Sequence, residues 1–167
     1  MMRMVAALPL LLLASCPPDR VTPVTVPDAP DLETAAIARG LVRDSRDVSP
    51  TGLYARDTDR LCVVPDGGAY RVGAYVDYGD GIACAGSGRA TRSGSAMRVA
   101  LGEGNCRFDA IFDGDRIEFP ARLPEACDAM CGRSASFAAL RVERLSESVS
   151  EAAAMRNPDG VTPCATR

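Results

Sequence analysis

The chain has 167 residues and a formal net charge of −3, and it contains neither histidine nor lysine, so all 19 basic residues are arginine. These absences exclude Ser-His and Cys-His nucleophile pairs, imidazole metal ligands, Schiff-base lysines and the lysine of a phosphate loop. Arginine stays protonated, and the mildly acidic balance argues against nucleic-acid binding. The composition therefore predicts a non-enzymatic protein without cofactor or metal, and only carboxylate-dependent chemistry stays open as a catalytic alternative.

The first residues predict a secretory signal peptide. Arg3 precedes an apolar run at residues 5–13, which is too short for a membrane span of about 20 residues. The run ends in Leu13-Ala14-Ser15-Cys16, which is similar to the lipobox of bacterial lipoproteins. This resemblance implies cleavage before Cys16 and a lipid such as palmitate on Cys16. The lipid would anchor the protein to a membrane. An ordinary secretory leader is the alternative.

Three regions follow from this leader: a signal peptide at residues 1–15, a lipidated cysteine with a proline-rich tether at 16–30, and one globular domain at 31–167. Five prolines in residues 17–30 favour an extended tether of about 40 Å. In the lipoprotein family, Asp after the lipidated cysteine favours the inner membrane, and this chain has Pro17 there. We therefore expect a cell-envelope protein that faces the periplasm, with the outer membrane favoured over the inner one.

The remaining cysteines are even in number, and a secretory leader would direct them to an oxidising compartment. They predict up to three disulfides, and six cysteines allow 15 pairings among which the sequence does not choose. The closely spaced cysteines 127 and 131 could suggest a metal site, but the sequence has no second such pair and no histidine to complete it. Disulfides are therefore the favoured interpretation. The six candidates are Cys62, Cys84, Cys106, Cys127, Cys131 and Cys164.

Helical patterns stand near the two ends of the globular domain. Asp31 caps a predicted helix at residues 32–42, whose apolar positions 32, 36, 37 and 41 we expect to pack against the domain. A capping box beginning at Ser148 predicts a helix that reaches residue 156. One or two further helical turns are predicted at residues 124–131, with a proline at their start.

Between these helices, apolar residues alternate with a period of two and are interrupted by turn signals. Glycines 86 and 88 predict a bulge or bend, and Asp113-Gly114 predicts a two-residue hairpin turn. About eight short strands at this spacing predict a mainly β fold, a small antiparallel barrel or sandwich. The strands are residues 52–56, 60–64, 69–76, 82–92, 96–101, 106–112, 116–119 and 137–144.

Two patterns could carry chemistry, and both have a simpler explanation. Asp77, Asp80, Asp113 and Asp115 lie next to glycines or in turns and lack the spacing of a calcium loop, so we interpret them as turn residues. The stretch 86–88, Gly-Ser-Gly, lacks the rest of a phosphate loop, and no histidine is present to activate its serine.

The stretch from Ser87 to Gly94 is similar in spacing to the Ser-Gly-x-x-Tyr-x-x-Gly stretch of the membrane-bound inhibitors of c-type lysozyme. Those proteins are small β-barrel lipoproteins that direct the serine at the lysozyme cleft, so the resemblance implies that Ser87 is a candidate contact. Thr91 stands where that family has tyrosine. This chain is also longer and has more cysteines.

Arg89, Arg92 and Arg98 lie across a predicted hairpin and are weak candidates for binding an anionic partner. A solvated face is the favoured interpretation of these arginines. Taken together, the sequence predicts a lipid-anchored envelope protein that acts as a binding or structural module for an envelope component or a small ligand. The alternative is a periplasmic inhibitor of c-type lysozyme.

Overall fold

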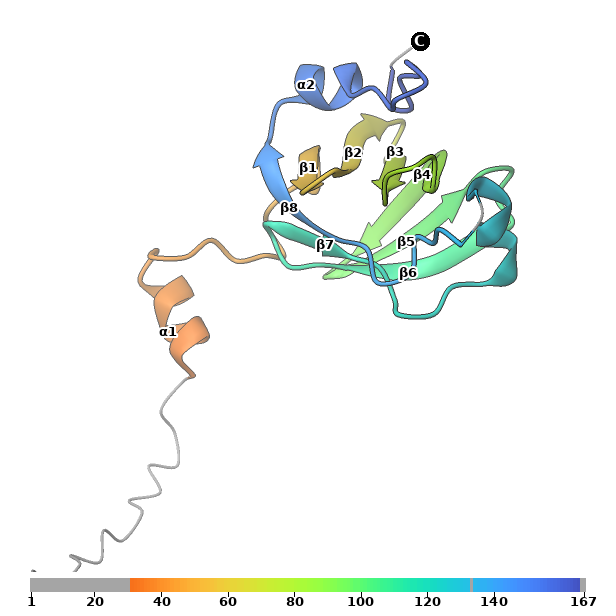
Figure 1. Cartoon of the computed structure of the whole chain (residues 1–167). Helices are drawn as coiled ribbons and strands as arrows, with labels where there is room; N and C mark the ends of the chain where they lie inside the picture. The colour runs from red at the N-terminus through yellow and green to blue at the C-terminus, as the bar shows by residue number, and fades with distance from the viewer. Residues whose placement is uncertain (1–30, 133, 166–167) are drawn as a thin grey trace, which may run out of the picture.

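The computed structural model describes residues 31–132 and 134–165, and its eight strands form one closed antiparallel barrel (Figure 1). Each strand pairs with the next one in sequence, and β8 closes the barrel on β1. This confirms the mainly β prediction and selects the barrel over the sandwich. The predicted signal peptide, Cys16 and the proline-rich tether lie outside the described residues. The strands are β1 (Gly52–Arg56), β2 (Asp59–Asp66), β3 (Ala69–Asp77), β4 (Ala83–Ser93), β5 (Ala96–Leu101), β6 (Cys106–Phe112), β7 (Arg116–Glu118) and β8 (Arg141–Ser146).

Alternating apolar residues fill the inside of the barrel. Strand β6 is the clearest case, because its residues alternate strictly between buried and exposed. The rings of Phe108 and Phe119 pack together with centroids 4.6 Å apart. An eight-stranded barrel is just wide enough for side chains to fill it, so this interior is a core. Its largest fully buried members are Tyr54, Leu61, Val63, Val72, Met97, Val99, Leu101, Phe112, Ile117, Phe119 and Phe137.

Glycines 86 and 88 were predicted to mark a bulge or bend in β4. The prediction of a bulge is wrong. The pairing of β4 with β3 runs without a break from Ala83 to Ala90. The glycines are needed because neighbours come close: a Cβ on Gly88 would collide with the carbonyl oxygen of Ala100, and one on Gly86 would lie 2.7 Å from the sulfur of Met130. They permit close packing against the strand.

The last strand begins later than predicted. We expected it at residue 137, but β8 begins at Arg141. Residues 137–140 instead form a turn, in which Leu140 N–H bonds the Phe137 carbonyl at 3.1 Å. Ala139 has a φ of 58°, which no strand residue adopts. The β6–β7 turn has two residues, as predicted, but it is displaced by one: Asp113 N–H bonds the Arg116 carbonyl at 3.2 Å, which leaves Gly114 and Asp115 at its tip.

A second, smaller core lies outside the barrel wall, over β2. The helix α2 (Val149–Ala154) begins at Ser148, whose hydroxyl accepts the Glu151 N–H at 3.3 Å, as its capping box predicts. Ala152 of α2 packs with Val64 and with the cysteine pair Cys62 and Cys164. The C-terminal residues thereby cover one outer face of the sheet.

Three disulfides join the six predicted cysteines. Cys62–Cys164 fixes the C-terminal residues to β2, while Cys84–Cys131 and Cys106–Cys127 fix the short 3-10 helix η1 (Glu125–Met130) to β4 and β6. This helix occupies the predicted helical turns. Several disulfides in one small domain indicate a protein that resides outside the cytoplasm.

The N-terminal helix α1 (Leu32–Ala38) is capped by Asp31 as predicted, but it is shorter than expected. Gly40 adopts a φ of 67°, and the N–H groups of Gly40 and Leu41 bond the carbonyls of Ile37 and Ala36 in a Schellman motif that ends the helix. The prediction that this helix packs on the domain is wrong for Leu32 and Leu41, which are exposed, whereas Ala36 and Ile37 are half-buried. Among the described residues, no helix has the length and apolar character to cross a bilayer.

Candidate functional site

The two ends of the barrel are closed differently. The chain reaches β1 through residues 44–51, which we call the N-terminal strap, and which lie at the end where β4 and β6 finish. The connection from β7 to β8, including η1, lies at the other end (Figure 1). We refer to these as the strap end and the η1 end.

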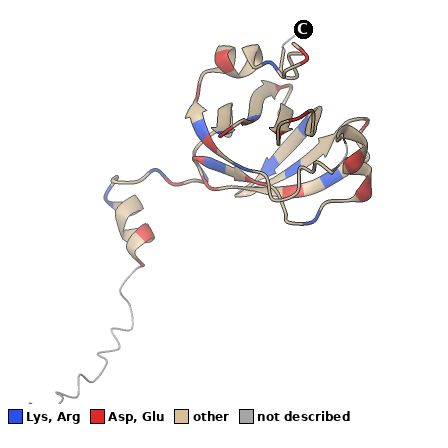
Figure 2. Cartoon of the chain, in the orientation of Figure 1, with Lys and Arg blue, Asp and Glu red and all other residues tan. Residues whose placement is uncertain are grey.

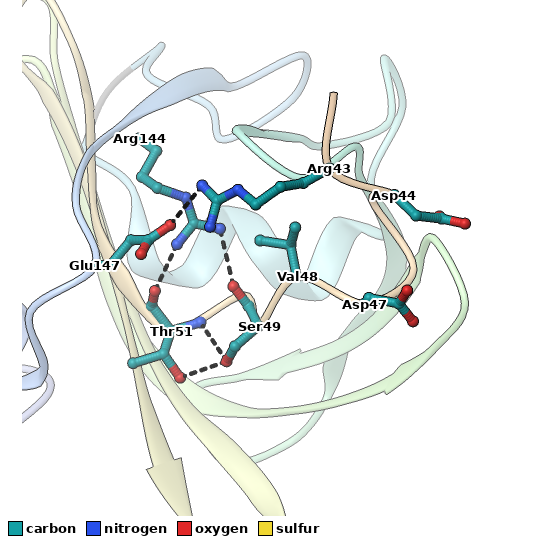
Figure 3. Close-up of a pocket in the computed structure, with 8 residues that line it drawn as sticks. All are labelled: Arg43, Asp44, Asp47, Val48, Ser49, Thr51, Arg144 and Glu147. Carbon is teal, nitrogen blue, oxygen red and sulfur yellow. Dashed lines mark hydrogen bonds and ion pairs between the residues drawn. The ribbon is translucent and has the colours of Figure 1, made fainter. Parts of the chain in front are cut away.

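Arg144 fixes the strap at its end of the barrel. Its guanidinium donates to the carbonyl oxygens of Thr51 at 2.7 Å and Ser49 at 2.9 Å in the strap (Figure 3). It also donates to the carbonyl oxygen of Gly114 at 2.7 Å. It also lies 5.0 Å from the ring centroid of Tyr54. The side chain of Arg144 is only 7 % exposed. Because its donors are engaged by backbone, this cation is structural.

Arg92 has the same role from the neighbouring side. Its guanidinium donates to the carbonyls of Ser45 at 2.6 Å and Val48, and it stacks 4.7 Å over the ring of Phe112. The predicted basic cluster is therefore divided, because Arg92 faces the barrel interior. Arg89 and Arg98 face outward.

Arg89 and Arg98 each have an acidic neighbour. Arg89 lies 3.1 Å from the Asp66 carboxylate, and Arg98 lies 3.2 Å from that of Asp109 on β6. The three arginines do not converge on one anion site.

A cavity of about 480 Å³ opens beside the strap, between Arg43, Asp47 and Arg144. Its carboxylates do not face one another as a catalytic pair would. Glu147 lies 3.0 Å from Arg43, and Asp44 lies 2.6 Å from Arg46, which holds the pKa of Asp44 at about 2. Asp47 lies on the opposite side of the cavity from Glu147 (Figure 3).

A groove of about 330 Å³ lies on the outer face of β3 and β4, toward the η1 end. Ser87 is exposed in it and stands between two glycines, so its hydroxyl is open to a ligand. Met130 of η1 forms one side of the groove. Val161 and Pro163, in the C-terminal residues, form the other side.

Both sides of this groove are fixed covalently to the strands beneath them. Cys131, next to Met130, is bonded to Cys84 of β4, and Cys164, next to Pro163, is bonded to Cys62 of β2. The floor consists of small residues of β3 and β4, which are Ala74, Ala85, Gly86 and Ser87. The groove therefore has a fixed shape, which reduces the entropy lost when a ligand binds.

The groove offers apolar contact and hydrogen bonds. Asn157 uses its side-chain oxygen to accept the Val161 N–H at 2.8 Å, so it supports the groove. Burial raises the pKa of the Tyr75 hydroxyl to about 12 and raises the pKa of the Asp59 carboxyl, but neither residue lines the groove. The lining supplies no acid or base to assist Ser87.

Two of the four predicted turn aspartates accept hydrogen bonds from backbone N–H groups in their turns. Asp77 accepts the Gly79 N–H at 2.8 Å, and Asp113 accepts the Arg116 N–H at 2.9 Å. Within residues 31–132 and 134–165, no three His, Cys, Asp or Glu side chains come together as metal ligands would.

Comparison with known proteins identifies no family, because no family model, no curated protein and no solved structure matches the chain. The groove is a feature that sequence reasoning missed in part. Ser87 was singled out, but Met130 and Pro163 come from distant parts of the chain. Only the disulfide pairing places them on either side of it.

Proposed function

We propose that this protein is a lipid-anchored, non-enzymatic binding module of the cell envelope, facing the periplasm, and that it takes a partner in the groove around Ser87. The observation that carries the proposal is the groove with both sides fixed by disulfides. A filled barrel interior leaves the outer surface as the place for binding.

The position of the groove suits an anchored protein. The proposed lipid on Cys16 reaches the barrel through the strap, which Arg92 and Arg144 attach at one end. The groove has Gly102 and Met130 in its lining, both from the other end of the barrel. A partner approaching from the periplasm would meet the groove before the tether.

Two matched variants test this proposal. Ser87→Arg fills the groove, whereas Thr91→Arg adds the same side chain at another exposed position of β4 outside the lining. We expect affinity capture from envelope extract to recover the same partner, identified by mass spectrometry, with the wild-type protein and with Thr91→Arg. Ser87→Arg should not recover it. Equal retention by both variants would place binding elsewhere.

A second candidate is inhibition of c-type lysozyme, which the exposure of Ser87 in the groove favours. Exposed carboxylates also lie within two residues of the lining, and they are Glu103, Asp128 and Asp159. Figure 2 shows acidic residues on η1. This charge would attract a basic protein and raise its rate of association.

The lysozyme candidate has a direct assay. If it is right, the purified protein inhibits cell-wall lysis by hen-type lysozyme, Ser87→Arg abolishes inhibition and Thr91→Arg does not. Absence of both binding and inhibition by the wild-type protein would remove this candidate and leave the first proposal intact.

A further inference from the structure

The segment that precedes the strap exposes apolar side chains. Leu32 is 90 % exposed, Leu41 is 75 % exposed and Val42 is 51 % exposed, while α1 buries none of its residues. Ile37 of α1 lines an open cavity with the β4–β5 turn, but Leu32, Leu41 and Val42 do not line it. Apolar residues that the domain leaves uncovered at adjacent positions call for a partner surface.

The end of α1 combines these apolar residues with positive charge. The Schellman motif at Gly40 places Leu41 and Val42 after the helix, between the exposed Arg39 and Arg43. Arg43 reaches Glu147 at 3.0 Å, and its side chain is nevertheless 67 % exposed. Apolar side chains flanked by arginines are the composition of segments that lie in the headgroup region of a bilayer.

We propose that residues 39–43 lie on the surface of an anionic lipid bilayer, with Leu41 and Val42 inserted among the acyl chains and Arg39 and Arg43 at lipid phosphates. The proposal rests on the proposed lipid anchor. Only residues 17–30 separate Cys16 from Asp31, a length of about 40 Å when extended, so α1 is the first described element that an anchored chain brings to the membrane.

A contact at this place would orient the barrel. The strap follows Arg43 directly and is attached to the barrel through the carbonyls of Ser45 and Thr51. Seating residues 39–43 on the bilayer therefore turns the strap end toward the membrane. It leaves the groove at Ser87 open to the periplasm.

The absence of tryptophan from the chain makes a clean test possible. Leu41→Trp places a single reporter in the proposed contact, and Tyr78→Trp is the control, because Tyr78 is 60 % exposed and directly follows β3 at the η1 end. Unacylated protein with residues 16–167 is coupled through the Cys16 thiol to a maleimide lipid in phosphatidylglycerol vesicles. The other six cysteines are paired and do not compete.

We expect the emission of Leu41→Trp to move to shorter wavelength and to be quenched by brominated acyl chains, while Tyr78→Trp shows neither change. In Leu41→Trp, adding Arg39→Ala and Arg43→Ala should reduce the quenching. Equal quenching of both reporters, or none at residue 41, would overturn the proposal. Chemical coupling makes this result independent of whether cells acylate Cys16, which the mass of the native protein reports separately.

Discussion

At each end of this barrel a segment of the chain crosses the opening, and the two segments are held there by different chemistry. At the strap end, Arg92 and Arg144 hold a crossing segment through hydrogen bonds to its carbonyls and through contact with the Phe112 ring. At the η1 end, the Cys84–Cys131 and Cys106–Cys127 disulfides hold a short 3-10 helix.

This difference explains why the groove lies toward the η1 end. A covalent bond keeps Met130 in place whatever the ionic strength or the ligand does, whereas a hydrogen-bonded segment exchanges its partners with water more readily. The strap end joins the domain to its tether, and the η1 end keeps the shape of a binding surface.

The largest effect should come from removing the disulfides at η1. We expect the paired change Cys84→Ala with Cys131→Ala, and likewise Cys106→Ala with Cys127→Ala, to lower the free energy of unfolding by about 2–4 kcal/mol each. Guanidinium denaturation measures this. A loss under about 1 kcal/mol for both pairs would show that packing alone closes the η1 end.

At the strap end, Arg144→Met should lower the free energy of unfolding by about 2–4 kcal/mol, because it leaves the half-buried carbonyls of Thr51 and Gly114 without a donor. The control is Arg98→Met, which removes an exposed ion pair and should cost less than about 1 kcal/mol. Equal costs for the two variants would contradict a structural role for Arg144.

Arg92 and Arg144 hold neighbouring parts of one strap and share the Phe112 ring, so their effects should not add. Once one arginine is lost, part of the strap is already free, and losing the other costs less. We expect Arg92→Met with Arg144→Met to destabilise the fold by about 1 kcal/mol less than the sum of the single changes. Strict additivity in a double-mutant cycle would mean that the two sites are independent.

The smallest effect concerns Asp59, at the η1 end, whose carboxyl has its pKa raised chiefly by burial. The stability that its neutral form contributes is complete below the unfolded value of 3.8 and is lost as the pH rises through the higher folded value. Asp59→Asn keeps an acceptor for the Asp77 N–H and removes the ionised form. It should therefore stabilise the fold at pH 7 by less than about 1 kcal/mol, with no gain at pH 3.

The sequence predicted the strands well because each strand has one face in the core, but it left open whether they form a barrel or a sandwich. Strands β1, β5 and β6 begin and end where alternation predicts. The alternation also contained a signal that was missed: Arg144 follows Val142 by two residues on the inward face, as Arg92 follows Ala90. An arginine at an inward position near a strand end indicates a charge that holds another segment.

Other features depend on contacts between distant residues, so no local pattern predicted them. The disulfide pairing was one of 15 possibilities. Alternation of Ala138, Leu140 and Val142 suggested a strand, but the turn at Ala139 interrupts it. Met130 and Pro163 meet across the groove only because Cys131 and Cys164 are bonded to different strands.

In-cell photo-crosslinking tests most directly whether a partner binds in the groove. A benzophenone amino acid replaces Val161, which lines the groove and is 57 % exposed, or Ile111, which is 60 % exposed on β6 outside it. The account predicts one discrete adduct from position 161 and none from position 111. Adducts of equal yield at both positions, or at position 111 alone, would contradict it.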